Sequence, residues 1–312
     1  MSDDRKLTLK GVVCAAVTPL EKGKLHVENH QRHIKTLAEE GCDGVLLLGT
    51  TGEGPSIGLA ERAEIIEATL AVSGEMKIMV GTGLASLPDT ITATRQAFDL
   101  KVDAVVVIPP FYFKKVSDEG LVAYYRQLFD EAVPDDGLLL AYHIPQVTAV
   151  PISCDLLEKL LVIGGDRMAG VKDSSGDLDH TLELCRRFPQ LRIFVGNDKL
   201  LLQSLQAGAA GCITAGANVL APLAANVYRA YTAGEDAGEH QALLTAARGI
   251  LEGHPPFPPA MKGLLENRYG TSGWEVRPPL DPLPESGRQA LWSALNALDL
   301  PEQYRWLKQA AV

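Results

Sequence analysis

The sequence predicts a (β/α)8 barrel, a TIM barrel of the α/β class, followed by a C-terminal α-helical appendage. Eight short apolar runs have the length of strands, and each is bounded by Gly, Pro or Asp. Segments with helical periodicity lie between these runs, which is the pattern of βα units in a parallel sheet. Eight such units close a barrel of about 250 residues, so a chain of 312 residues has room for the barrel and the appendage.

The predicted elements follow in order. The strands lie at residues 12–20, 44–49, 77–83, 104–110, 138–145, 168–173, 192–198 and 211–217. The amphipathic segments between them, which are long enough for right-handed crossovers, lie at 28–40, 58–72, 88–100, 117–133, 153–161, 178–188 and 199–207. A doubly wound sheet is the alternative fold. Its dinucleotide-binding form loses support because no G-x-G-x-x-G follows the first strand and opens a helix.

Further helical stretches follow Pro222, and two proline-rich segments, HPPFPP and RPPLDPLP, interrupt them. These stretches lie at 223–233, 237–252, 259–269 and 287–298. We therefore expect a catalytic barrel over residues 1–222 and a helical domain over residues 223–312.

Composition narrows the class of partner. The chain has 29 basic and 39 acidic residues, a net charge of −10, and no run of Lys or Arg, which argues against nucleic acid or an anionic membrane surface as partner. Its apolar runs are far shorter than the roughly 20 residues that span a bilayer, and the start MSDDRK has no signal-peptide core. We expect a cytoplasmic protein that acts on a small molecule.

Cysteine and histidine spacing gives no metal or disulfide signature. The five cysteines are odd in number and form no CxxC pair, so we expect free, mostly buried thiols; they are Cys14, Cys42, Cys154, Cys185 and Cys212. His26, His30 and His33 share one helix face, but no acidic cluster joins them at a strand end. We interpret this face as solvated surface and expect no metal site.

In a closed barrel, reactive groups belong at the C-terminal ends of the strands. Lys172 is the next-to-last residue of the sixth strand, and alternation places it on the face opposite Val171 and Asp173. Inside the lumen its neutral amine would be a nucleophile able to form a Schiff base with a ketone, whereas at the rim it would contact solvent. Tyr142, at the end of the fifth strand, is either a proton shuttle or a packed aromatic. His143 alternates to the opposite face, and we expect it to be structural.

The run Gly49-Thr50-Thr51-Gly52-Glu53 follows the second strand. Its small and hydroxylic residues let backbone N–H groups approach an anion, although a plain βα turn is the alternative.

Three motifs on these strand ends resemble a known family. GTTGE at 49–53, YHIP at 142–145 and GVKDSSGD at 170–177 are similar to the dihydrodipicolinate synthase and N-acetylneuraminate lyase superfamily of pyruvate-dependent Schiff-base enzymes. The resemblance covers about residues 12–265. It also includes VTP at 17–19, GTG at 81–83, SDEGL at 117–121, GND at 196–198 and PPAMK at 258–262.

The resemblance implies a role for each matching residue. Lys172 matches the Schiff-base lysine and Tyr142 the catalytic tyrosine, so no cofactor is needed beyond the covalent imine on Lys172. Thr50 and Thr51 match the pair that holds the substrate carboxylate and relays protons through a hydroxyl. Gly196 and Ile213 match pocket positions near the imine. The family commonly forms homotetramers built from two tight dimers, which implies a homotetramer or homodimer here.

Two departures from the synthase pattern are informative. Synthases carry an arginine, two residues beyond the proline of the YHIP segment, that binds the carboxylate of aspartate semialdehyde; here that position is Val147. An apolar side chain cannot pair with an anion, so a tail arginine such as Arg277 or Arg268 would have to reach the pocket. Synthases also extend a tyrosine from a neighbouring subunit, where this chain has Phe113 beside Tyr112.

The sequence therefore predicts a carbon–carbon lyase that forms a Schiff base with a 2-oxo acid such as a 2-keto-3-deoxy sugar acid, giving or using pyruvate and an aldehyde. The alternatives within the family are dihydrodipicolinate synthase, a keto-deoxy sugar acid dehydratase and a hydratase-aldolase. The alternative from a different class is a binding barrel without catalysis. The presence of Lys172, Tyr142, Thr50 and Thr51 together argues against that last alternative.

Overall fold

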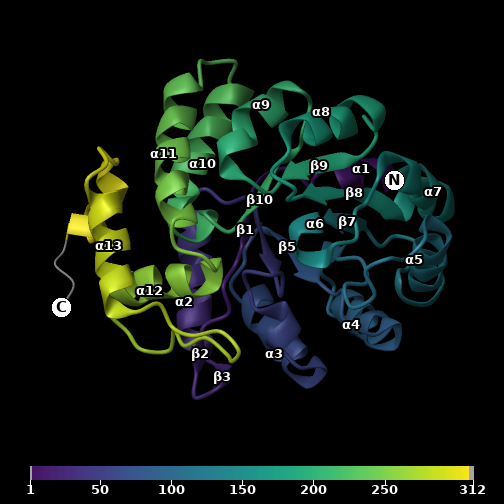
Figure 1. The fold of residues 1–312 in the computed structure, drawn as a ribbon, viewed down its shortest axis with the longest axis horizontal. Helices are drawn as coiled ribbons and strands as arrows, with labels where there is room; N and C mark the ends of the chain where they lie inside the picture. Colours follow the sequence, from purple (N-terminus) through teal and green to yellow (C-terminus); the bar gives the residue numbers. More distant parts are fainter. Residues whose placement is uncertain (1, 309–312) are drawn as a thin grey trace.

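The computed structural model describes residues 2–308 and shows a closed barrel of eight parallel strands (Figure 1). The strand order around the barrel is β1-β10-β9-β8-β7-β6-β5-β4, and the predicted (β/α)8 fold is confirmed. The strands are β1 (Gly11–Ala15), β4 (Gly44–Leu47), β5 (Lys77–Gly81), β6 (Ala104–Val107), β7 (Leu139–His143), β8 (Met168–Asp173), β9 (Arg192–Val195) and β10 (Gly211–Thr214).

Side chains alternate between the barrel lumen and the layer beneath the helices. The inward-facing side chains include Val13, Leu46, Leu140, Phe194 and Ile213, and they form a packed apolar cluster separate from the larger outer core. The outer core joins the other face of the strands to the surrounding helices. A filled lumen leaves room for chemistry only at the ends of the strands.

Helices follow the strands and cover the outside of the barrel. They are α2 (Val27–Glu39), α3 (Leu59–Leu70), α4 (Leu87–Asp99), α5 (Asp118–Ala132), α7 (Cys154–Gly164), α8 (Leu178–Arg187), α9 (Leu201–Gln206) and α10 (Ala217–Thr232). Serines begin three of them: the hydroxyls of Ser86, Ser117 and Ser153 each accept a hydrogen bond from a backbone N–H in the first turn. Such a cap satisfies one of the donors that a helix N-terminus leaves free.

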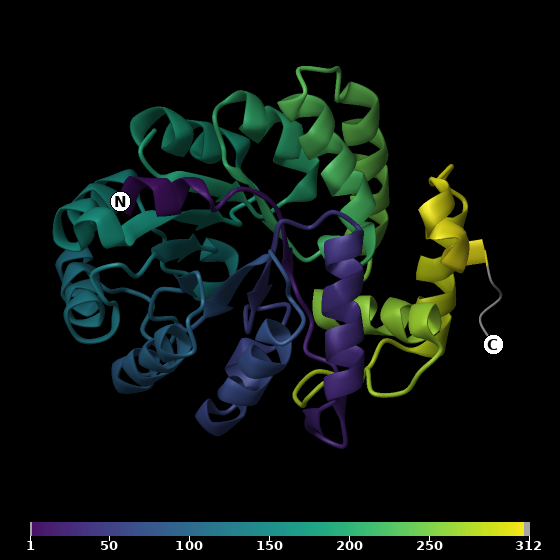
Figure 2. The same ribbon diagram turned by 180° about the vertical axis from the view of Figure 1, so that it is seen from behind.

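The C-terminal helices are α11 (Gly238–Glu252), α12 (Phe257–Tyr269) and α13 (Glu285–Asn296), followed by a 3-10 segment over Glu302–Lys308. Helices α11 and α12 pack against α10, and α13 packs against α11 and α12. Helix α13 lies on the side of the molecule opposite α1 (Figure 2). The helix predicted at 223–233 is longer than expected, because α10 begins at Ala217 and continues through Pro222 after a break in helical geometry at Leu220. The proposed division at residue 222 therefore falls inside α10, which packs against β1.

Several short elements were not predicted. Helix α1 (Ser2–Leu7) precedes the barrel, α6 (Pro145–Thr148) follows β7, and 3-10 turns occupy Gly54–Ser56, Gly165–Arg167 and Asp198–Leu200. The first predicted strand was too long, since β1 ends at Ala15 and the chain then forms a hairpin of β2 (Leu20–Glu21) and β3 (Lys24–Leu25). The other predicted strands extend past the observed ends into loops, except 168–173, which matches β8.

The prediction of a solvated histidine face on α2 was wrong. His30 is 1% and His33 is 0% exposed, because this side of α2 packs against α3, α10 and Tyr269 of α12. Nε2 of His30 lies 2.7 Å from Oγ1 of Thr69, and Nδ1 of His33 lies 3.1 Å from the hydroxyl of Tyr269. Burial lowers the pKa of His30 to about 4 and that of His33 to about 3. These histidines are neutral packing residues.

All five cysteines are free and buried, as predicted. Among the described residues, no helix has the length and apolar character needed to cross a membrane.

Candidate active site

Lys172 and Tyr142 lie side by side at the end of the barrel lumen. They are register partners on β8 and β7, and Nζ of Lys172 lies 4.1 Å from the centroid of the Tyr142 ring. Both side chains are buried, Lys172 at 4% and Tyr142 at 5% exposed. Lys172 also pairs in register with Phe194, a lumen residue of β9, which puts the lysine inside the barrel and not at a solvent-facing rim.

The Tyr142 hydroxyl is the centre of a hydrogen-bonded group that includes Thr50, Ser174 and Lys172. Burial raises the pKa of Tyr142, but the neighbouring Lys172 charge and these three hydrogen bonds outweigh it, so the pKa lies below its ordinary value. A phenol with a lowered pKa next to an amine is suited to passing a proton to and from that amine. The arrangement therefore supplies a nucleophile and an adjacent acid or base.

Ser174 is a member of this group that the sequence analysis missed. It lies two residues beyond Lys172, and period-two alternation along β8 could have pointed to it. The glycine at position 196 leaves room for the Ser174 side chain, because a Cβ at residue 196 would lie 2.1 Å from Oγ of Ser174. The N–H of Gly196 also donates to the carbonyl of Asp173 at 2.6 Å, which joins β9 to the end of β8.

Thr50 and Thr51 lie in the turn after β4, Thr50 exposed and Thr51 buried. A buried ion pair between Glu53 and Lys262 of α12 fixes this turn, with both side chains at most 1% exposed. The other Glu53 oxygen accepts the N–H of Arg277 at 2.8 Å, and Nζ of Lys262 donates to the carbonyl of Glu275 at 2.6 Å. The C-terminal segment thus holds the threonine turn in place, a contact that sequence spacing does not reveal.

A cavity of about 130 Å³ opens beside Tyr142, over the ends of β4 to β7. Thr50 and Tyr142 supply its two side-chain hydroxyls, and its apolar wall includes Pro55, Val106, Ile108, Phe111 and Val147. Of the sequence-predicted site residues, the structure brings Thr50, Tyr142 and Val147 to this cavity. Gly196 follows β9 and Ile213 lies on β10, on the other side of Lys172, and neither lines the cavity.

The two departures from the synthase pattern have clear positions. Val147 lies on α6 and is 52% exposed at the cavity wall. The tail arginines have other partners. Nη1 and Nη2 of Arg277 donate to the Glu61 carboxylate at 2.9 and 2.8 Å, and Arg268 forms an ion pair with Glu40. Neither is among the cavity-lining residues in the part of the chain that the structure describes.

Tyr112 and Phe113 lie on the loop after β6, 73% and 71% exposed. Their rings meet edge to face at 5.2 Å, and their neighbour Phe111 lines the cavity in their place.

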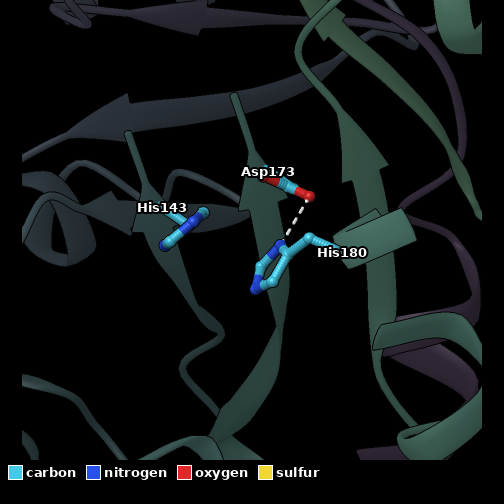
Figure 3. Close-up of side chains that lie close together, drawn as sticks. All are labelled: His143, Asp173 and His180. Atoms are coloured by element: carbon cyan, nitrogen blue, oxygen red, sulfur yellow. Dashed lines mark hydrogen bonds and ion pairs between the residues drawn. The ribbon is translucent and has the colours of Figure 1, made fainter. Parts of the chain in front are cut away.

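Figure 3 shows a cluster formed by His143 of β7, Asp173 of β8 and His180 of α8, in which Asp173 follows Lys172 along β8. Nδ1 of His180 lies 3.0 Å from Oδ2 of Asp173, and the two histidine rings stack with centroids 4.4 Å apart. The hydrogen bond to Asp173 raises the pKa of His180, whereas burial lowers the pKa of His143 to about 4. His143 accepts the N–H of Ile152 at 2.9 Å, a structural contact.

The ligand atoms of this cluster lie within 4.8 Å of one another, a spacing that suggests a metal ion. However, both Asp173 oxygens already accept hydrogen bonds: Oδ1 from the N–H of Ser175 at 3.0 Å, and Oδ2 from the hydroxyl of Thr181 at 2.7 Å besides His180. The two stacked imidazole rings also lie in separate, nearly parallel planes with centroids 4.4 Å apart, so their in-plane lone pairs do not readily converge on one ion. The cluster fits a hydrogen-bonded support for the strand end that carries Lys172.

Known proteins resemble this chain over almost its whole length. The model of the Dihydrodipicolinate synthetase family matches residues 8–298. A relative from Chloroflexus aurantiacus, named an uncharacterized DapA-like lyase, is 42% identical, with 93% of this chain and 97% of the relative covered.

Two solved structures extend the comparison. The dihydrodipicolinate synthase of Agrobacterium tumefaciens is 31% identical with a TM-score of 0.83, covering 93% of this chain and 99% of that one. KD(P)GA from T. tenax is 28% identical with a TM-score of 0.81, covering 92% and 98%. Lyases of this family are class I aldolases, which form a pyruvate imine on a lysine and use no external cofactor. The chain therefore belongs to the Dihydrodipicolinate synthetase family and is a lyase of the class I aldolase type.

Proposed function

We propose that the enzyme cleaves a 2-oxo acid with a 4-hydroxyl group, such as a 2-keto-3-deoxy sugar acid, to pyruvate and an aldehyde, or joins the two in reverse. Lys172 is the Schiff-base residue, Tyr142 the acid and base, and Thr50 with Thr51 the group that holds the substrate carboxylate. The observation that carries the proposal is the placement of Lys172 Nζ over the buried Tyr142 ring at the C-terminal end of the barrel strands.

The steps follow from this placement. The Lys172 amine attacks the C2 ketone, and Tyr142 supplies the proton with which the carbinolamine oxygen leaves as water, which gives an imine. Loss of the 4-hydroxyl proton then breaks the C3–C4 bond, releasing the aldehyde while the electron pair moves into an enamine. Protonation at C3 and hydrolysis of the imine return pyruvate and free Lys172. Positioned acid–base groups typically contribute about 10²- to 10⁴-fold to such a rate.

The cavity wall supports cleavage over dihydrodipicolinate synthesis. A synthase must bind the carboxylate of aspartate semialdehyde, and Val147 offers it no positive charge. The direct test is a screen of 2-oxo acids for pyruvate release, with condensation of pyruvate and aspartate semialdehyde run alongside. We expect release from at least one 2-keto-3-deoxy acid and negligible condensation. Efficient condensation with no release would assign the chain to the synthases.

We also propose that the enzyme works as a homotetramer or homodimer. The support is the exposed aromatic pair Tyr112 and Phe113 beside the cavity, since large exposed apolar side chains grouped together mark contact surfaces. Light scattering of the purified protein tests this, and a monomer at micromolar concentration would contradict it.

A cytoplasmic location completes the proposal. Its support is that all five cysteines are free, which suits a reducing compartment. Fractionation of the source cells, with the protein followed by immunoblot, tests it.

A further inference from the structure

Two side-chain hydroxyls line the cavity beside Tyr142, those of Thr50 and Tyr142, and both belong to the hydrogen-bonded group around Tyr142. Lys172 is the register partner of Tyr142 and does not itself line the cavity. In the proposed mechanism, the part of a bound 2-oxo acid that becomes pyruvate is tied to Lys172 and meets these hydroxyls. The part that becomes the aldehyde then extends past Tyr142 into the cavity.

The rest of the wall is mostly apolar. Pro55, Ile108, Phe111 and Val147 present hydrocarbon, and the wall at Gly83 is tight, since a Cβ there would lie 2.5 Å from a methyl of Ile108. The carbonyl of Gly81, which also borders the cavity, already accepts a hydrogen bond from Arg62 at 2.8 Å. A chain of hydroxyl groups entering this space would leave water and find few partners, which is unfavourable.

The volume fits one compact group. An apolar cavity of about 150 Å³ is enough to bind benzene, and this cavity holds about 130 Å³. We propose that, within the proposed class of 4-hydroxy-2-oxo acids, the enzyme prefers substrates whose aldehyde half carries a compact apolar group, either a single aromatic ring or a branched alkyl chain. It prefers them to sugar acids, whose aldehyde half is polyhydroxylated, and to acids whose aldehyde half carries a carboxylate. This inference rests on the proposed function, because it assigns the second half of the same substrate.

A cation, Lys114, lies near the cavity mouth, so the alternative to exclude is a substrate whose aldehyde half carries a carboxylate. The exposed Lys114 ammonium donates to the carbonyls of Phe111 and Thr148, the first of which belongs to a cavity-lining residue. If Lys114 turned to meet an anionic aldehyde, a carboxylate-bearing substrate would be favoured, and replacing Lys114 would remove that preference.

The test compares kcat/KM for pyruvate release from three 4-hydroxy-2-oxo acids whose aldehyde halves are benzaldehyde, 3-methylbutanal and glyceraldehyde. We expect the first two to exceed the third by about 10- to 100-fold, the range that an apolar pocket achieves. Val147→Thr should narrow this ratio, whereas Val162→Thr, on an 85% exposed position of α7, should leave it unchanged.

Pyruvate trapping by borohydride, run on every variant, separates the two claims. Trapping on Lys172 together with equal or faster cleavage of the glyceraldehyde-derived acid, or with no cleavage of any of the three, would overturn the apolar assignment and leave the Schiff-base function standing. A carboxylate-bearing acid that is cleaved faster than all three, with an advantage lost in Lys114→Met, would also overturn it. Absence of trapping would overturn the proposed function itself.

Discussion

Nζ of Lys172 lies 4.1 Å from the centroid of the Tyr142 ring, and the two residues pair in register across β8 and β7. The same register that closes the barrel therefore sets the distance between the amine and the phenol. Both side chains are buried, so bulk water would not compete for a proton passed between them.

Tyr142→Phe should lower turnover by about 10²- to 10⁴-fold, because it removes the acid–base hydroxyl and keeps the ring beneath Lys172. Steady-state kinetics measures the loss, and pyruvate trapping should survive in part. The matched control is Tyr125→Phe, which removes another buried phenol. The Tyr125 hydroxyl donates a hydrogen bond of 3.2 Å to the carbonyl of Val107 and takes no part in the group around Tyr142. Equal rates for wild type and Tyr142→Phe would transfer the proton role to another group, with Tyr112 the first to test.

Ser174→Ala should raise the pKa of Tyr142, since one of the hydrogen bonds that lower it is lost. We expect the alkaline limb of the kcat–pH profile to shift to higher pH. We also expect the rate to fall about tenfold, which corresponds to the loss of one hydrogen bond of about 1.4 kcal/mol. Ser175→Ala is the neighbouring control, because Oγ of Ser175 accepts the N–H of Asp177. A profile that moves equally in both variants would remove Ser174 from the group around Tyr142.

The buried pair of Glu53 and Lys262 should show strong coupling. Glu53→Gln or Lys262→Met alone leaves one buried group without its partner and should cost roughly 3–5 kcal/mol of unfolding free energy. The double variant Glu53→Gln with Lys262→Met should recover a large part of that loss, as urea denaturation can show. Glu266→Gln, which breaks a partly exposed pair with Arg288, should cost about 1 kcal/mol or less. Additive losses in the double variant would contradict the coupling.

The neutral buried histidines should make the protein sensitive to acid. His30, His33 and His143 have pKa values of about 4, 3 and 4, against 6.5 when unfolded, so the unfolded chain takes up more protons below pH 6.5. Their contribution to stability is present above pH 6.5 and is lost as pH falls from 6.5 toward 4, by up to about 1.4 kcal/mol per pH unit for each residue.

Urea denaturation between pH 7 and 5 measures this dependence. The slope of unfolding free energy against pH reports how many protons the chain takes up on unfolding. His33→Gln should lower this slope by the contribution of one proton, and the exposed control His240→Gln should leave it unchanged. A stability that stays constant over this range would refute the role given to the histidines.

Local periodicity was enough to predict the barrel and the strand face of Lys172. Eight apolar runs set the strand number, and alternation placed Lys172 opposite Val171 and Asp173. Alternation left open whether that face is the lumen or the rim, which the register with Phe194 decides. Strand ends were less predictable, because apolar residues continue past the last ladder hydrogen bond into loops such as the one after Ala15.

Contacts between distant residues escaped the sequence analysis. The face of α2 that carries His30 and His33 is hidden by Thr69 and Tyr269, the second 236 residues away from His33. Glu53 and Lys262 are 209 residues apart, and neither has a neighbour in sequence that indicates the pair. Ser174 differs from these, since its two-residue spacing from Lys172 is local and predicts a shared face.

The central claim is that Lys172 forms the imine, and reductive trapping tests it most directly. The protein is incubated with pyruvate, reduced with borohydride and digested, and the adduct is located by peptide mass spectrometry. The account predicts a single labelled lysine, Lys172, and no label in Lys172→Arg, while Lys262, a second buried lysine held by Glu53, stays unlabelled. Label on Lys262 or on any lysine other than Lys172, or no label at all, would contradict the account.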